Sequence, residues 1–145
     1  LCPIVLTISE RIFAGKNINL SVDIAEDTLV LADLDQIEQV LKSYLENAAS
    51  HVNVGGDVKI TAILKGDRYC VTVYNSGSHI DEEIMPQIWQ SFYRGDKSHN
   101  RESGRFGLGL SIAAAIVKGH GEDYGVYNAE KGVCFWFTIK AATEN

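Results

Sequence analysis

Residues 104–111 read Gly-Arg-Phe-Gly-Leu-Gly-Leu-Ser and run directly into Ile112-Ala-Ala-Ala-Ile-Val-Lys118, and residues 108–118 are helix-like and rich in alanine. Glycines allow a backbone to approach a ligand closely, and the first turn of a helix offers unpaired N–H groups and a positive dipole end. The stretch therefore predicts a phosphate-binding loop at the start of a helix. The alternative is a flexible loop whose glycines only cap a buried helix, because short glycine motifs also occur by chance.

Two better-known phosphate-binding loops do not fit this stretch. Gly104 and Gly109 have the spacing of a P-loop, but Leu110 stands where that motif needs a lysine. A dinucleotide-binding fingerprint needs a preceding strand, and the polar residues 96–103 do not form a strand pattern. Residues 94–105 have no periodicity at all, and ordered loops of that length are typically lids or binding loops.

The composition is that of one folded domain of 145 residues, with 46% hydrophobic residues. Lys and Arg number 13 against 19 Asp and Glu, and the net charge of −6 argues against a nucleic-acid binder. Any anionic ligand must therefore be held by local groups. The widely spaced Cys2, Cys70 and Cys134 form no metal-binding pair and are expected to be reduced thiols. The lack of an initiator Met predicts that the chain is part of a longer one.

Residues 33–52 form the clearest predicted helix, with Asp33 as its N-cap and an apolar stripe along one face. Asn47 lies at the border of this stripe, with Ser43 one turn before it and His51 one turn after it. An amide oxygen in that position can coordinate a hard cation such as Mg²⁺. The alternative is an asparagine that is satisfied by the backbone within a packed helix.

Alternating apolar and polar residues elsewhere predict strands, and two further segments predict short helices. The expected strands are 17–23, 58–64, 69–74, 124–127 and 133–139, and the expected helices are 3–13 and 81–93. Helices that alternate with strands favour a layer of helices on a sheet, so we predict one α/β domain.

Residues 74–80, Tyr-Asn-Ser-Gly-Ser-His-Ile, leave a predicted strand at a glycine turn. The Asn75 amide can both donate to and accept from a planar heterocycle, and Ile80 can form an apolar wall beside it. The alternative is a plain connecting turn of Asn, Ser and Gly.

An aromatic run that includes Trp89, Phe92 and Tyr93 precedes two positive charges, Arg94 and Lys97, a few residues before the glycine stretch. These two charges can meet phosphates. The alternatives are a core role for the aromatic rings and a solvated loop for the charges.

The order of these elements resembles the catalytic, ATP-binding domain of bacterial sensor histidine kinases, in the GHKL superfamily shared with gyrase and mismatch-repair ATPases. The resemblance covers nearly the whole chain, with 33–52 as the N box, 73–80 as G1, 88–94 as the F box and 104–110 as G2. It implies the Bergerat fold: a two-layer α/β (α+β) sandwich with a mixed, largely antiparallel sheet of about five strands on about three helices. It also implies a mobile ATP lid at 96–106, and a single catalytic domain over 1–145 that lacks the phospho-accepting histidine.

The resemblance implies a role for each matching residue. Asn47 would coordinate Mg²⁺, Arg94 would reach the γ-phosphate of ATP, and these two would be the catalytic residues. Asn75 would face the adenine amino group. The other nucleotide-binding residues would be His51, Gly77, Ile80, Phe92, Tyr93, Lys97, Gly107, Leu108, Gly109 and Leu110.

The activity implied is transfer of the γ-phosphoryl group to a histidine on a separate dimerisation domain, with a response regulator downstream. The full-length protein would then be a membrane-anchored homodimer with this domain in the cytoplasm. Two alternatives remain: a degenerate GHKL binding module with weak or no nucleotide binding, and a GHKL serine kinase that inhibits a partner protein. Five positions depart from the family pattern and bear on nucleotide affinity more than on the fold: Ser43, Ser50, Asn75, His79 and Val133.

Overall fold

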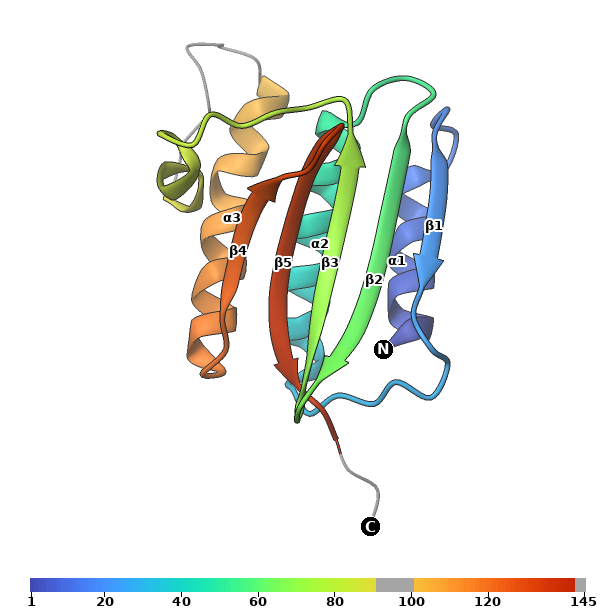
Figure 1. Ribbon diagram of the computed structural model, residues 1–145, viewed down its shortest axis with the longest axis vertical. Helices are drawn as coiled ribbons and strands as arrows, with labels where there is room; N and C mark the ends of the chain where they lie inside the picture. The colour runs from blue at the N-terminus through green and yellow to red at the C-terminus, as the bar shows by residue number, and fades with distance from the viewer. Residues whose placement is uncertain (91–100, 143–145) are drawn as a thin grey trace.

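The computed structural model describes residues 1–90 and 101–142, without the side chains of 101–108. Within these ranges, a five-stranded sheet carries three α-helices on one face (Figure 1). The elements in chain order are α1 (Cys2–Phe13), β1 (Asn19–Asp23), α2 (Leu34–His51), β2 (Asp57–Lys65), β3 (Arg68–Ser76), the 3₁₀ helix η1 (Met85–Trp89), α3 (Arg101–Gly119), β4 (Tyr124–Asn128) and β5 (Gly132–Lys140).

The sheet is mixed and largely antiparallel, with strand order β1-β2-β3-β5-β4. Only the pairing of β1 with β2 is parallel among these described strands, and the other three pairings are antiparallel. The predicted fold class, a two-layer α/β sandwich, is confirmed. No helix in the described residues is long and apolar enough to cross a membrane.

Helix α2 lies along the centre of the covered sheet face, between α1 and α3 (Figure 1). The predicted N-cap is confirmed, because Oδ1 of Asp33 accepts a hydrogen bond of 2.9 Å from the backbone N–H of Gln36. The predicted apolar stripe is buried except at its first residue, Leu34, which is 56% exposed at the start of the helix. The other members are at most 5% exposed: Ile37, Leu41, Tyr44, Leu45 and Ala48.

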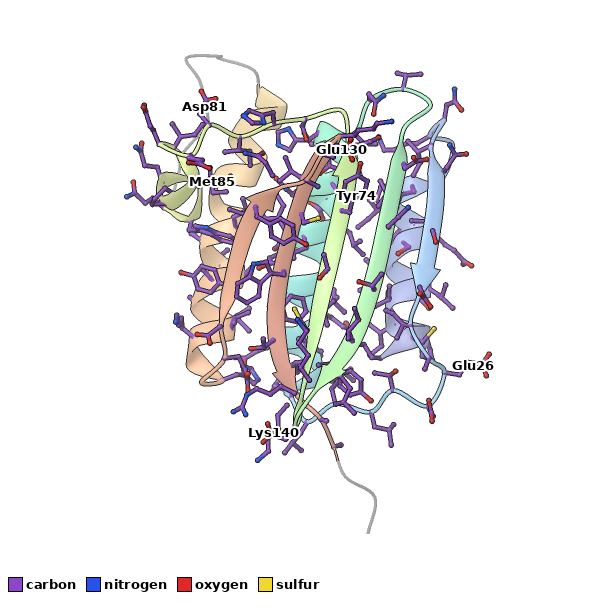
Figure 2. The ribbon with its side chains drawn as sticks, in the orientation of Figure 1. Glu26, Tyr74, Asp81, Met85, Glu130 and Lys140 are labelled. Atoms are coloured by element: carbon purple, nitrogen blue, oxygen red, sulfur yellow. The ribbon has the colours of Figure 1, made fainter. Side chains whose placement is uncertain are left out.

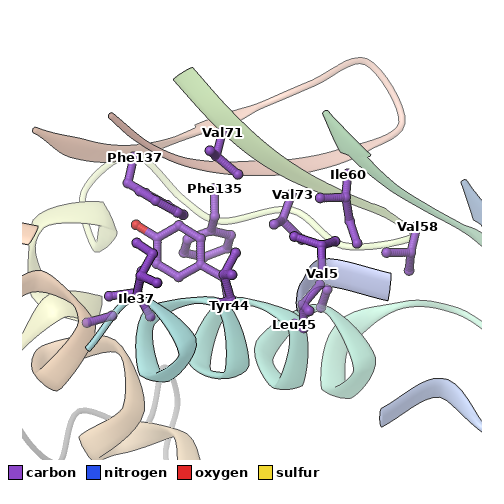
Figure 3. Packing of buried hydrophobic residues seen from close by; sticks show 14 of the residues in the cluster. Val5, Ile37, Tyr44, Leu45, Val58, Ile60, Val71, Val73, Phe135 and Phe137 are labelled. Atoms are coloured by element: carbon purple, nitrogen blue, oxygen red, sulfur yellow. The ribbon is translucent and has the colours of Figure 1, made fainter. Parts of the chain in front are cut away.

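The core is formed where this stripe meets the inward-facing residues of β2, β3 and β5. Figure 3 shows the Tyr44 ring of α2 reaching up to Phe135 and Phe137 of the sheet, with ring centroids 5.9 and 5.3 Å away. The Tyr44 hydroxyl donates to the backbone carbonyl of Trp136 at 3.0 Å. Burial raises the pKa of Tyr44, so the phenol stays protonated and keeps this hydrogen bond. Packing and one directed bond thus fix the rotation of α2 about its own axis.

Two predicted segments differ from the structure. The last residues of the expected helix at 81–93, 91–93, lie outside the described residues. In the rest of it only the 3₁₀ helix η1 forms, since Pro86 has no N–H with which to continue a helix begun at 81, and Gln90 is already extended (φ −81°, ψ 146°). The expected loop at 94–105 is also wrong in part, since α3 begins at Arg101 and includes 101–105. The glycines at 104, 107 and 109 therefore lie inside a helix. A glycine in a helix costs only about 1 kcal/mol relative to alanine, which the packing of the following turns on α2 can offset.

Replacing Tyr44 by Phe tests the bond that orients α2. The Tyr44→Phe chain should lose about 1 kcal/mol of unfolding free energy in urea denaturation, because the ring packing remains while one buried hydrogen bond is lost. Tyr74→Phe is the matched control, since Tyr74 lies on the sheet face opposite the helices and is labelled in Figure 2. Equal stabilities for the two variants would contradict the role given to the Tyr44 hydroxyl.

Candidate functional site

The candidate site lies at one end of the sandwich, where three elements meet. Figure 1 shows the C-terminal end of α2, the C-terminal end of β3 and the N-terminal part of α3 at the same end of the molecule. Asn47 and His51 lie on α2, Asn75 is the penultimate residue of β3, and Gly109 and Leu110 lie on α3. The fold thus brings together residues that are far apart in the sequence.

Asn47 and Ser43 are buried polar residues on α2, at 2% and 5% exposed. Nδ2 of Asn47 and Oγ of Ser43 have no hydrogen-bond partner within the described part of the chain. A Cβ placed on Gly109 of α3 would lie 3.7 Å from Oγ of Ser43, so the two helices approach closely here. Buried polar groups are nearly always hydrogen-bonded in folded proteins. An amide and a hydroxyl left without partners therefore mark a place for a polar ligand.

The same place fits a magnesium ion that is held mainly by a phosphorylated ligand. The described residues contain no group of three or more His, Cys, Asp or Glu side chains able to hold a metal by themselves. Mg²⁺ prefers oxygen ligands, keeps several waters, and often binds through one or two protein groups plus substrate phosphates. The side-chain oxygen of Asn47 is a ligand of this kind.

The turn after β3 is built around Asn75, which is 1% exposed on the inward face of the sheet. Its Nδ2 donates to the backbone carbonyl of Ser76 at 3.2 Å and to Oγ of Ser78 at 2.7 Å. Gly77 follows with φ 86°, and a Cβ there would lie only 2.5 Å from Oδ1 of Asn53. A side chain at Gly77 would thus be strained in backbone and in space. The predicted glycine turn is confirmed in its geometry.

Three contacts from outside the turn hold it in place. Ser76 donates through Oγ to Oδ1 of Asn53 at 2.7 Å and accepts at Oγ from the backbone N–H of Asp57 at 2.8 Å. The backbone N–H of Gly77 donates to the carbonyl of Lys131 at 3.0 Å. The loop after α2 and the turn before β5 thus fix the backbone on both sides of Gly77.

Asn128, the last residue of β4, holds the predicted apolar wall at Ile80. Its Oδ1 accepts from the backbone N–H of Ile80 at 3.0 Å, and its Nδ2 donates to the carbonyl of Ile80 at 2.7 Å. The sequence reasoning missed this role, and it missed the role of Asn53. Their one available signal is an amide side chain at the end of a strand or helix, and only the topology shows which backbone it reaches.

The structure describes only some of the predicted nucleotide-binding residues. Leu110 is 6% exposed and packs in the core, so its backbone is the part free to approach a ligand. Gly107 and Leu108 lie within α3, where their side chains are outside the described residues. Phe92, Tyr93, Arg94, Lys97 and the first half of the predicted lid, 96–100, also lie outside the described residues.

Two further predicted residues lie near the turn and the α2 terminus. His51 reaches the surface at the end of α2, but the protein around its ring lowers its pKa through burial, which favours the neutral imidazole. His79, one of the five positions that depart from the family pattern, has its side chain 70% exposed and lies 3.8 Å from Asp81. The ring centroids of Trp89 and Tyr124 are 4.6 Å apart, and Trp89 packs against the core. Figure 2 labels Met85, which begins the same short helix η1.

Comparison with known proteins identifies the family. A family model described as histidine kinase-, DNA gyrase B- and HSP90-like ATPase matches residues 32–143, and the chain belongs to this family. The sensor protein VanSB of Enterococcus faecalis is 32% identical over 125 residues, which cover 86% of this chain and 28% of that protein. The sensory kinase SasA of a Synechococcus species is 33% identical over 133 residues, covering 90% of this chain and 34% of that protein. The chain therefore spans about a third of the length of these curated relatives.

A solved structure supports the same assignment. The catalytic domain of the histidine kinase ThkA is 31% identical with a TM-score of 0.82, and the match covers 96% of this chain and 92% of that one. The histidine kinase ThkA has also been solved in complex with the response regulator protein TrrA, and that chain matches at 29% identity and TM-score 0.80. The predicted resemblance to the catalytic domains of sensor histidine kinases is confirmed.

The pKa of His51 gives a test of the α2 terminus. We expect its ring to titrate below the value of about 6.5 that an unperturbed histidine shows, because burial disfavours the charged imidazole. The unfolded chain then binds this proton at a higher pH than the folded chain does. Because His51 is protonated first in the unfolded chain, the free energy of unfolding decreases as the pH falls below about 6.5. The ring-proton chemical shifts of His51, followed against pH by NMR, measure the midpoint, and the chain in urea is the reference. A midpoint at or above that of the urea-unfolded chain would contradict the assignment.

Proposed function

We propose that this chain is the ATP-binding catalytic domain of a two-component sensor histidine kinase, with residues 1–145 as a single domain. The observation that carries the proposal is the buried Asn47 amide, whose Nδ2 lacks a partner within the described residues one turn from the Ser43–Gly109 approach. The braced turn at Asn75 supplies a second polar group at the same end of the fold. Membership of an ATPase family and likeness to sensor kinases support the same reading.

In this proposal the two ends of ATP are held by different elements. Asn75, Gly77 and Ile80 take the adenine base, with Ile80 kept in position by Asn128. Asn47 gives an oxygen ligand to Mg²⁺, which supplies charge neutralisation for the phosphates. His51, Phe92, Tyr93, Lys97 and the backbone of 107–110 border the phosphates and the lid.

The chemical step we propose is transfer of the γ-phosphoryl group to a histidine on a separate dimerisation domain. Such a step needs positioning and electrostatic stabilisation more than covalent participation by the protein. Arg94 would stabilise the charge on the γ-phosphoryl group as it is transferred, because a guanidinium matches phosphate geometry with two hydrogen bonds. A response regulator would then receive the phosphoryl group, and a membrane-anchored homodimer would hold this domain in the cytoplasm. The sensor kinases among the relatives and the ThkA–TrrA complex support these partners.

The magnesium role of Asn47 predicts a change in nucleotide affinity that depends on the metal. In calorimetric titration, Asn47→Ala should weaken the binding of Mg-ATP by about tenfold or more, about 1.4 kcal/mol, because one oxygen ligand is lost. With ATP and a chelator, the two chains should differ little. Glu46→Ala is the matched control, since Glu46 pairs with Lys42 on the outer side of α2. Weakening by the same factor with and without magnesium would argue against a metal ligand.

The phosphotransfer step predicts labelling of a histidine. Mixed with Mg-ATP and a fragment of the same protein that carries the accepting histidine, the chain should label that fragment with γ-phosphate. Arg94→Ala should reduce the initial rate by about a hundredfold or more, since an arginine on the transferred group is worth roughly 10³ or more in related reactions. Arg11→Ala, at the last turn of α1, controls for the loss of one positive charge. Labelling of serine instead of histidine would favour the serine-kinase alternative, and no binding of ATP would favour the degenerate module.

A further inference from the structure

The face of the sheet that is turned away from the helices is not covered by any other element in the described part of the chain (Figure 1). Figure 2 looks onto this outer face and labels Tyr74 toward one end of it and Lys140 at the other. Asn47 and Asn75, the central residues of the candidate site, lie on the helix side of the sheet. The outer face is therefore a separate surface, and apolar side chains that gather on it need their own explanation.

A hollow of about 390 Å³ lies in this outer face and is lined from four neighbouring strands. Ile63 of β2 and Tyr127 of β4 lie on its two sides and are 55% and 50% exposed. Cys70 and Thr72 of β3 and Trp136 of β5 lie between them, because β3 and β5 are the strands between β2 and β4. Exposed apolar surface that is also concave is typical of sites where proteins interact.

The outer hollow is preformed, because Trp136 is held to one side of it. Trp136 lies opposite Gly125 on β4, and a Cβ on Gly125 would lie only 2.6 Å from Cζ2 of the indole. The ring therefore lies directly over Gly125, which only a residue without a side chain allows. On β3 the partner of Trp136 is Thr72, and the next residue on the same face is Cys70. Both side chains are small, so the space beside the indole stays open.

Basic side chains lie at one end of the outer hollow. Lys65 lines it, Arg68 lies opposite Lys65, and Lys140 lies opposite Arg68 on the next strand. Arg68 is paired with Glu122, with 2.8 Å between Nε and Oε1, whereas Lys65 and Lys140 have no ion pair with any residue that the structure describes. Like charges on neighbouring strands repel one another. In a chain of net charge −6, this end of the outer face is thus locally basic and is matched by an acidic partner.

The shape of the outer hollow favours a polypeptide over a small molecule. Ile63 and Tyr127 are half exposed, so the hollow is open and would leave much of a small ligand in water, whereas small-molecule sites bury about 70% or more of their ligand. A polypeptide can insert one side chain and cover the surrounding strands with the residues on either side of it. A second copy of this chain fits less well, because a twofold contact through this face would set one basic surface against another.

We infer that the outer hollow binds a polypeptide segment in which an aromatic or large aliphatic side chain is flanked by Asp and Glu. The apolar side chain enters between Ile63 and Tyr127 and packs on the ring of Trp136, while the acidic side chains pair with Lys65 and Lys140. This inference is independent of the proposed function, because it concerns the other face of the sheet and needs no nucleotide. The surface would stay accessible while the candidate site is occupied.

The test uses a defined probe, the fluorescein-labelled peptide Gly-Asp-Glu-Phe-Leu-Glu-Asp-Gly, which is titrated with the unaltered chain and followed by fluorescence anisotropy. One altered peptide has Asn and Gln in place of its acids, and another has Ala in place of Phe and Leu. Each should bind about tenfold more weakly or worse, because one removes the charge pairing and the other removes the apolar anchor. Added salt should weaken the acidic peptide through screening. In NMR spectra, the amide signals of β2, β3, β4 and β5 around the hollow should shift, and that of Asn47 should not.

Substitutions on the outer face test where the peptide binds. Lys65→Glu should weaken the binding of the acidic peptide by about tenfold or more, because attraction becomes repulsion. Lys59→Glu is the matched control, since Lys59 lies on the same face of the same strand but does not line the hollow, and its effect should be about threefold or less. Thr72→Phe fills the hollow and should weaken binding by a similar factor to Lys65→Glu. If thermal unfolding shows that Thr72→Phe does not fold, the two lysine variants still decide the matter.

The outcomes that would overturn the inference are distinct. Absence of binding by the acidic peptide, or equal weakening by Lys65→Glu and Lys59→Glu, would overturn the docking site. Equal affinity for the acidic peptide and the two altered peptides would overturn the chemistry assigned to the partner. Binding of anilinonaphthalene sulfonate in the hollow without binding of the peptide would overturn the choice of a polypeptide in favour of a small aromatic anion. NMR shifts around the hollow that appear only as the concentration of the chain rises would overturn it in favour of a second copy.

Discussion

The packing of α2 against the sheet is the constraint on which the rest of the structure depends. Tyr44 is packed against Phe135 and Phe137 and bonded to the backbone of β5, so the helix can neither slide nor rotate without breaking the core. A fixed rotation of α2 turns Ser43 and Asn47 away from solvent and places Ser43 against Gly109 of α3. The polar groups of the site are therefore positioned by apolar packing on the neighbouring face of the same helix.

The parts of the fold that the sequence predicts are those where periodicity and burial agree. α2 and the strands β2, β3 and β5 have regular apolar patterns, and the structure buries their inward-facing residues against one another, whereas Leu20 in the edge strand β1 is 39% exposed. Asn47 and Asn75 could be singled out because each stands at a marked place in such a pattern, at the edge of a helical stripe and at the end of a strand. The local sequence is informative at these two positions because the neighbouring residues in the chain also determine the surroundings of each side chain.

The features that the sequence does not predict depend on contacts between residues far apart in the chain, or on the packing of one element against another. Asn128 and Ile80 are 48 residues apart, and Asn53 and Ser76 are 23 apart, so no local pattern could pair them. The predicted start of α3 lies too late in the chain, because three glycines suggest a loop, whereas packing of the later turns on α2 decides whether the helix continues. A similar limit applies to η1, where Pro86 signals an interruption but does not say which helix type results.

The amides and hydroxyls that brace the turn after β3 have a consequence for how the site responds to its surroundings. Asn53, Asn75 and Asn128, together with Ser76 and Ser78, make these contacts without any group that gains or loses a proton between pH 4 and 9. A turn anchored by carboxylates would loosen in mild acid, as each anchor became neutral. Here the anchoring bonds persist over that range, and acid sensitivity is confined to ionisable neighbours such as His51. The side of the candidate site formed by the turn after β3 is thus insulated from changes in proton concentration, while the side near the α2 terminus is not.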